Sequence, residues 1–196
     1  TFGDGTNGTG MTVTHSYAEN GTYTVTLTVT DNDGATASTS ATKTILNTPP
    51  VASFTASPNP VNKGQPATFN ASASYDPDGS IVSYSWAFGD GANSTGITTS
   101  HSYTENGTYL VMLTVTDDDG STGTANATVT ALNRPPVASF TESASTVLTN
   151  VTIYFNASAS YDPDGSIASY FWNFGDGINA TGITASHAYV ETGTYA

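Results

Sequence analysis

Two short turns carry the residues of this chain that are best suited to binding an ion. Asp76-Pro-Asp-Gly79 and Asp162-Pro-Asp-Gly165 each place two carboxylates two residues apart beside a glycine. Hard oxygen ligands on such a loop suit Ca²⁺, which takes six to eight oxygens. The same aspartates could equally serve only to cap a turn through side-chain hydrogen bonds. Asp117-Asp-Asp119, with Asp31-Asn-Asp33 as its copy, is a second and weaker acidic candidate.

The other reactive residues do not form a catalytic set. His15, His101 and His187 are one position copied three times, and no spacing selects one serine as the partner that a Ser-His-Asp site requires. Gly89-Asp-Gly91 lacks the lysine of a phosphate-binding loop. The chain has no cysteine, so a thiolate metal site is excluded. We therefore predict that the chain is not an enzyme and that its histidines are buried, hydrogen-bonded structural residues.

These residues recur because the chain repeats itself. The sequence Phe-Gly-Asp-Gly begins at Phe2, Phe88 and Phe174, in two steps of 86 residues, with no insertion between copies. An internal repeat indicates one folding unit that has been duplicated. We expect residues 1–46 to be the C-terminal part of one repeat, 47–132 a complete repeat, and 133–196 the N-terminal part of a further repeat. The chain would then be a window on a longer repetitive protein.

The repeat is rich in strand signals. In Thr108–Thr116, residues Tyr109, Val111, Leu113 and Val115 alternate with residues of the opposite face, which predicts a strand with one buried side. Turns containing Gly, Pro, Asn and Asp separate this segment from other alternating segments. About seven short strands and one tryptophan per repeat predict an all-β fold of tandem immunoglobulin-like β-sandwiches. Tyr109 follows a turn, where a tyrosine corner would lie.

The ordered motifs Pro-Pro-Val-Ala-Ser-Phe, Ser-Tyr-Asp-Pro-Asp-Gly-Ser-Ile, Tyr-x-Trp-x-Phe-Gly-Asp-Gly, His-x-Tyr and Gly-Thr-Tyr-x-Val-x-Leu-Thr-Val-Thr-Asp resemble the PKD (polycystic kidney disease) domain over the whole chain. The resemblance implies an immunoglobulin-like sandwich of extracellular proteins that acts as a spacer or binding module. By the same resemblance, Ca²⁺ would be held in the complete repeat by Asn47, Asp76 and Asp78. In the last repeat it would be held by Asn133, Asp162 and Asp164. The residue after the tryptophan, often Asp in the family, is here Ala87 or Asn173.

Composition narrows the range of partners. Sixteen acidic and three basic residues give a net charge of −13, which disfavours nucleic acid because counterion release needs clustered Lys and Arg. No apolar run is long enough to span a membrane. Asn-x-Ser/Thr sequons suggest a glycosylated, extracellular or cell-surface protein. The sequons are at Asn7, Asn20, Asn70, Asn93, Asn106, Asn126, Asn150, Asn156 and Asn179.

The main functional prediction is a structural extracellular protein that forms part of a cell-surface layer, stalk or filament, with neighbouring copies of itself as partners. Near-identical tandem copies joined by Pro-Pro linkers and the acidic surface favour it. The alternative is an accessory polysaccharide- or collagen-binding module of a secreted hydrolase. In that case Tyr75 and Tyr161, beside the Asp-Pro-Asp-Gly turns, could stack on sugars or on a collagen strand, although rim packing is the simpler expectation.

Overall fold

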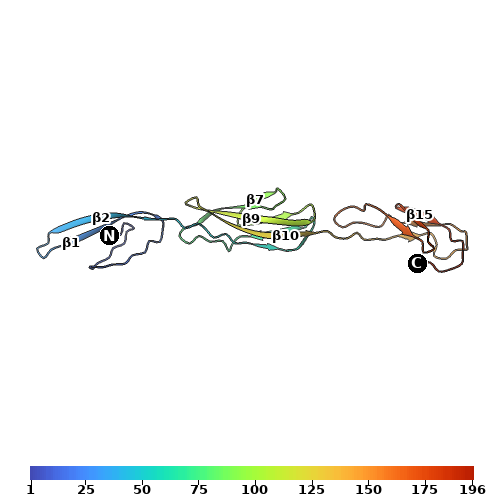
Figure 1. Cartoon of the computed structure of the whole chain (residues 1–196), viewed down its shortest axis with the longest axis horizontal. Coiled ribbons are helices and arrows are strands. Elements are labelled where there is room, and N and C mark those ends of the chain that lie inside the picture. The colour runs from blue at the N-terminus through green and yellow to red at the C-terminus, as the bar shows by residue number, and fades with distance from the viewer. The chain divides into compact units, whose positions relative to one another are not determined.

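The computed structural model describes all residues from 1 to 196 and consists of strands, turns and loops (Figure 1). It contains no helix that could cross a membrane. The chain divides into two compact units. The first comprises residues 1–61, 65–103 and 107–131, and the second comprises 62–64, 104–106 and 132–196.

The complete repeat forms two antiparallel sheets from eight strands, one more than about seven predicted, because the two-residue β4 counts as a strand. The order is β4-β10-β9-β6-β7 in one sheet and β3-β5-β8 in the other. The strands are β3 (Thr55–Ser57), β4 (Val61–Asn62), β5 (Pro66–Asn70), β6 (Ile81–Ala87), β7 (Asn93–Thr95), β8 (Thr98–Ser102), β9 (Gly107–Asp117) and β10 (Thr122–Leu132).

The core lies between these two sheets and follows the predicted alternation. Trp86 of β6 is 1% exposed, makes an edge-on contact with Phe54 at 5.1 Å, and packs on Phe69 of β5 at 5.7 Å. Its indole Nε1 donates to the Gly96 carbonyl at 2.8 Å, so the buried polar group is satisfied. Strand β9 pairs with β6 so that Leu113 lies opposite Trp86. The other fully buried members include Ala67, Phe88, Tyr103, Val111, Val115 and Val129.

Residues 21–45 form a long hairpin of β1 (Gly21–Thr30) and β2 (Thr36–Ile45). These strands are the copies of β9 and β10, and they pair in the same register: Leu27 faces Thr39 as Leu113 faces Ala125. Leu27 and Val29 are 55% and 54% exposed, whereas their counterparts Leu113 and Val115 are fully buried. One face of this hairpin is therefore an apolar surface without a covering sheet.

The second unit contains the last repeat. Ile153, Phe155 and Phe174 form a small core there, with Trp172 packed against it. The sheet orders are β11-β12-β15 and β13-β14. The strands are β11 (Thr141–Glu142), β12 (Ile153–Asn156), β13 (Phe171–Asn173), β14 (Asn179–Thr181) and β15 (Thr184–His187).

Candidate functional site

The Asp76-Pro-Asp-Gly79 turn of the complete repeat is tied to the segment that leads into the sandwich. Asp78 Oδ2 accepts a hydrogen bond from the Thr48 backbone amide at 2.9 Å. Within the turn, the Asp78 amide donates to Asp76 Oδ1 at 3.3 Å. Asp76 Oδ2 is buried and has no hydrogen-bond partner. Part of the turn is thus self-capped, and one carboxylate oxygen is left without a donor.

Asp117, at the end of β9, belongs to the same place. It is 1% exposed, and its Oδ2 accepts the side-chain amide of Asn47 at 2.8 Å. That amide also donates to Ser121 Oγ at 2.9 Å. The sequence alone places Asp117 apart from Asn47, Asp76 and Asp78, and the structure brings it next to them. The signal that could have joined them is that Asp117 ends a strand whose neighbour β6 follows the Asp76 turn.

Burial raises the pKa of the Asp76 carboxyl, and the negative charges of Asp117 and Asp78 raise it further. The negative charges of these carboxylates are therefore not fully balanced within the site. No group of three or more His, Cys, Asp or Glu side chains is already arranged to hold a metal ion. The unpartnered Asp76 oxygen nevertheless fits a hard cation. Asn47 would offer its amide oxygen to that cation once the amide is turned over, because the two ends of an amide have nearly the same shape.

Asp118 takes a different role from its neighbour. Its Oδ1 accepts the Ser80 backbone amide at 2.8 Å, and this hydrogen bond lowers the pKa of Asp118. Asp118 therefore closes the loop after the Asp76 turn. In residues 1–46 the equivalent of Asp117 is Asp31, whose Oδ1 accepts the amides of Asp33 and Ala35 at 3.0 and 2.8 Å. At that copy the acidic turn shows only capping.

The last repeat keeps half of this arrangement. Asp164 Oδ2 accepts the Arg134 amide at 2.9 Å, and the Asp164 amide donates to Asp162 Oδ1 at 3.2 Å. Asp164 Oδ1 is buried and unpartnered. Asn133 differs from Asn47, because its side-chain amide donates to the Arg134 carbonyl at 3.2 Å. The two aspartates lie together here, and the Asn133 side chain faces its own backbone.

The three histidines are held in identical surroundings. His101 Nε2 lies 2.6 Å from Asp90 Oδ2, its ring stacks on Phe88 at 4.3 Å, and the edge of Tyr103 meets it at 4.7 Å. The predicted hydrogen bonding is present, with a side chain that is 15% exposed. Burial raises the pKa of Tyr103 to about 12, and Asp90 and Tyr109 add to that shift. The constant spacing of 11 residues between the Asp and the His was the signal that could have predicted this pair.

The tyrosines beside the carboxylate turns are exposed. Tyr75 and Tyr161 each show 57% of their surface, and their backbones bridge to Val51 and Val137. Rim packing was the simpler expectation, and the rings lie mostly open to solvent instead. Of the nine sequon asparagines, eight are exposed and Asn20 is half-buried.

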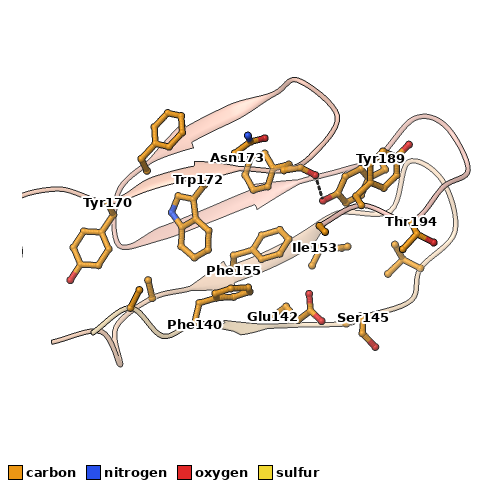
Figure 2. A pocket seen from close by; sticks show the side chains of 18 of the residues that line it. Phe140, Glu142, Ser145, Ile153, Phe155, Tyr170, Trp172, Asn173, Tyr189 and Thr194 are labelled. Atoms are coloured by element: carbon orange, nitrogen blue, oxygen red, sulfur yellow. Dashed lines mark hydrogen bonds between the residues drawn. The ribbon is translucent and has the colours of Figure 1, made fainter. Parts of the chain in front are cut away.

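A cavity of about 1100 Å³ opens in the second unit (Figure 2). Figure 2 shows Phe140, Phe155 and Trp172 on one part of its wall and Ile153 and Tyr189 on another. The corresponding residues of the complete repeat include Phe69, Trp86 and Tyr103, which are buried in its core with Val111, Leu113 and Val115 of β9. The cavity therefore lies where the complete repeat has the hairpin β9–β10. In this respect the cavity differs from a small-molecule pocket.

The family model for the PKD domain matches residues 1–46, 47–131 and 133–196. The chain belongs to the PKD domain family. Over 66 residues the PKD chain is 48% identical to the "Microbial collagenase" of Vibrio alginolyticus, a match that covers 34% of the chain and 8% of that protein. Over 63 residues it is 46% identical to the "Pre-pro-metalloprotease PrtV" of Vibrio cholerae, covering 32% of the chain and 7% of that protein.

Among solved structures, the PKD1 domain of Vibrio anguillarum Epp is 40% identical, with a TM-score of 0.39. That match covers 44% of the chain and 96% of the domain. The PKD chain thus matches less than a tenth of the length of the Vibrio alginolyticus collagenase and of Vibrio cholerae PrtV.

Proposed function

We propose that this PKD chain is an accessory, non-catalytic part of a secreted hydrolase, and that it holds the polymeric substrate of that enzyme, with collagen as the first candidate. The observation that supports this most directly is its 48% identity to a segment of a microbial collagenase. This is the alternative named from the sequence. The interpretation as a surface layer or filament draws no support from these relatives, which are named as proteases. An extracellular location follows from the same proposal.

The surface best suited to a polymer lies around the exposed tyrosines. Tyr75 and Tyr161 recur at one position of two successive repeats, each next to an exposed valine, Val51 or Val137. A flat aromatic ring with an apolar neighbour offers an apolar face on which a sugar or a proline-rich strand can pack. Two such contacts on one chain reinforce each other when both reach the same polymer.

A binding assay on insoluble polymers tests this proposal. The chain is incubated with fibrillar collagen, chitin and cellulose, and the bound fraction is measured over a range of protein concentrations. We expect retention on collagen, and about a tenfold loss of affinity in Tyr75→Ala/Tyr161→Ala. Tyr154→Ala, which changes another exposed tyrosine away from these turns, is the matched control. Retention on a polysaccharide alone would select the other substrate class, and retention on none would refute the proposal.

We also infer that Ca²⁺ binds between Asn47, Asp76, Asp78 and Asp117. The unpartnered Asp76 oxygen and the unbalanced charge around it favour a cation over the alternative of capping alone. A bound Ca²⁺ would supply positive charge to the buried carboxylates. The chain's own contribution is to bring the segment at Asn47 and Thr48 against the Asp78 turn and the end of β9. The ion would therefore stiffen the junction before the sandwich. Asp162 and Asp164 would provide a weaker copy of the site.

A further inference from the structure

We propose that an N-linked glycan on Asn126 covers an apolar patch on the outer face of the complete repeat. The patch consists of Leu110 and Met112, which are 59% and 41% exposed. It lies in the repeat that has both of its sheets, on the side that faces away from the core. The proposal goes beyond a role in substrate binding and does not depend on it.

The direction of the side chains on β9 explains the patch. Val111 and Leu113 are fully buried in the core. Successive side chains of a strand point to opposite faces, so Leu110 and Met112 point outward, about 6.8 Å apart along the strand. On β6 the residue paired with Met112 is Ala87, whose small side chain gives little cover. Two large apolar side chains therefore stand next to each other in solvent, which calls for an occupant.

A glycosylation sequon lies directly beside the patch on β10, the neighbour of β9 (Figure 1). Asn126 pairs with Met112, and Thr128 pairs with Leu110. Directly opposite residues of an antiparallel pair have Cβ atoms about 4.5–5.5 Å apart. Asn126 and Thr128 are both exposed, so both side chains of the sequon are accessible on the same face as the patch. A sugar on the Asn126 side chain would begin next to Met112.

The first copy of the repeat has neither the patch nor the sequon. The same two cross-strand pairs are Thr24 with Thr42 and Thr26 with Ser40. Threonine thus replaces both apolar residues, and Ser40 replaces the sequon asparagine. The other sequons of the complete repeat that have a counterpart in residues 1–46 are kept in both copies: Asn93 with Asn7, and Asn106 with Asn20. The one sequon that is lost is the one beside the patch, which links the two features.

The surroundings of the patch suit a neutral sugar. The sheet of β4, β6, β7, β9 and β10 contains one charged residue, Asp117, and that residue is buried. Its outer face therefore offers no charge to a protein partner. A sugar ring has an apolar face of C–H groups and a rim of hydroxyls. The apolar face fits Leu110 and Met112, and the hydroxyls reach the paired threonines Thr114 and Thr124 further along the same face.

The attachment is a group transfer without a change of oxidation state. Asn126 Nδ2 attacks C1 of a lipid-linked oligosaccharide, and a C–N bond forms as the C–O bond to the lipid diphosphate breaks. The diphosphate leaves with the bonding electrons, and the amide loses one proton. The attached glycan is bulky and soluble in water, so it removes the patch from water without adding apolar surface.

Methyl spectroscopy tests the contact directly. The chain has two methionines, Met112 in the patch and the fully exposed Met11, so isotopically labelled methionine methyl groups give one signal from the patch and one internal control. In the chain secreted by a glycosylating host, we expect nuclear Overhauser effects between sugar protons and the Met112 methyl, and none from this glycan to Met11. Thr128→Ala abolishes the sequon and should lose them, whereas Thr128→Ser keeps the sequon and should retain them.

Ser72→Ala provides a control on the other sheet. It removes the sequon at Asn70 of β5 and should leave the Met112 signal unchanged. Mass mapping of the same samples reports occupancy. An unmodified Asn126 in the wild type, or a modified Asn126 without contacts to Met112, would refute the proposal.

A urea titration then shows whether the glycan acts through the patch. In the glycosylated chain, Thr128→Ala should unfold at a lower urea concentration than Thr128→Ser. The same two variants from a host without glycosylation give the baseline for the change of side chain. Leu110→Thr/Met112→Thr introduces the residues of the first copy, and in that background the difference should shrink to the baseline. An equal difference with and without the apolar pair would show that the glycan does not cover it.

Discussion

His101 and Asp90 form one hydrogen bond that the chain builds three times, with Nε2 and Oδ2 2.6 Å apart in each copy. The aspartate comes from the Phe-Gly-Asp-Gly turn, and the histidine lies 11 residues later. The phenylalanine of the turn stacks on the histidine ring at 4.1 to 4.4 Å. The hydrogen bond links the turn before β7 to strand β8. It also holds the His101 ring against Tyr103, whose ring stacks on Tyr109.

These aspartates should make the free energy of unfolding depend on pH in the acid range. In the first copy, the Thr6 hydroxyl above all, with the Thr6 amide and His15, outweighs burial and lowers the pKa of Asp4 from 3.8 to about 2. At Asp90 burial acts in the opposite direction, but the hydrogen bonds from His101 and Ala92 prevail and the pKa is lowered. A lowered native pKa means that the stabilisation is present above about pH 4 and is lost as the pH falls through the native value.

We therefore expect the melting temperature of the complete repeat to decrease as the pH is lowered below about 4. Trp86 fluorescence in a Trp172→Phe background isolates this repeat. Asp90→Asn should cost about 1 kcal/mol at pH 7, since the hydrogen bond is charge-assisted but partly screened by solvent, and should flatten the acid dependence. If the melting temperatures of the wild type and Asp90→Asn change in parallel with pH, Asp90 contributes nothing to the acid dependence.

The first glycine of the same turn should be irreplaceable. Gly89 has φ +85°, and a Cβ there would lie 2.6 Å from the Leu110 carbonyl oxygen. Gly91 has a similar φ of +94° but nothing within 4 Å. Gly91→Ala should cost about 1–2 kcal/mol of backbone strain, and Gly89→Ala should cost about 1–3 kcal/mol more for the clash. Urea denaturation of both variants measures the difference, and equal losses would mean that β9 shifts freely away from the turn.

Calcium should raise the melting temperature through Asp76. A cation at a hundredfold excess over its dissociation constant adds about 2.7 kcal/mol to the free energy of unfolding. For a domain of this size that corresponds to a shift of about 10 °C or more, measured with Ca²⁺ and then with a chelator. Asp76→Asn should abolish the shift, and exposed Asp119→Asn should retain it.

The same substitution makes a second prediction in the absence of metal. Because the native pKa of Asp76 is raised, its contribution to stability is present at low pH and is lost as the pH rises through the native value. Asp76→Asn should therefore be as stable as the wild type, or more stable, in chelator at pH 7. A marked loss there would indicate that the carboxylate only caps its turn.

Glycan attachment should follow exposure. Expression in a glycosylating host, with peptide mass mapping, should find modification at exposed sequons such as Asn70, Asn126 and Asn156. Asn20 should stay unmodified, because it is half-buried and its carbonyl accepts the Tyr23 hydroxyl at 3.4 Å. Occupancy at Asn20 with the exposed sites empty would contradict this ordering.

The sequence by itself determined the repeat, the all-β sandwich and the inward residues of each strand. Alternation in Tyr109–Val115 is a local property of a strand, and one buried face follows from it without knowledge of the partner strand. The corner tyrosines were equally local: Tyr23 and Tyr195 donate to the carbonyls of Glu19 and Glu191, four residues earlier. The structural role of the histidines followed from their repetition.

Only the tertiary structure decided which residues meet across the sheets. Asn47 and Asp117 are 70 residues apart in the sequence and share a hydrogen bond because β9 ends where the leading segment passes. The exposure of Tyr75 was also beyond the sequence, since rim packing was the simpler expectation for this residue. Burial is set by what another strand covers, and such long-range contacts leave no trace in the spacing of a single strand.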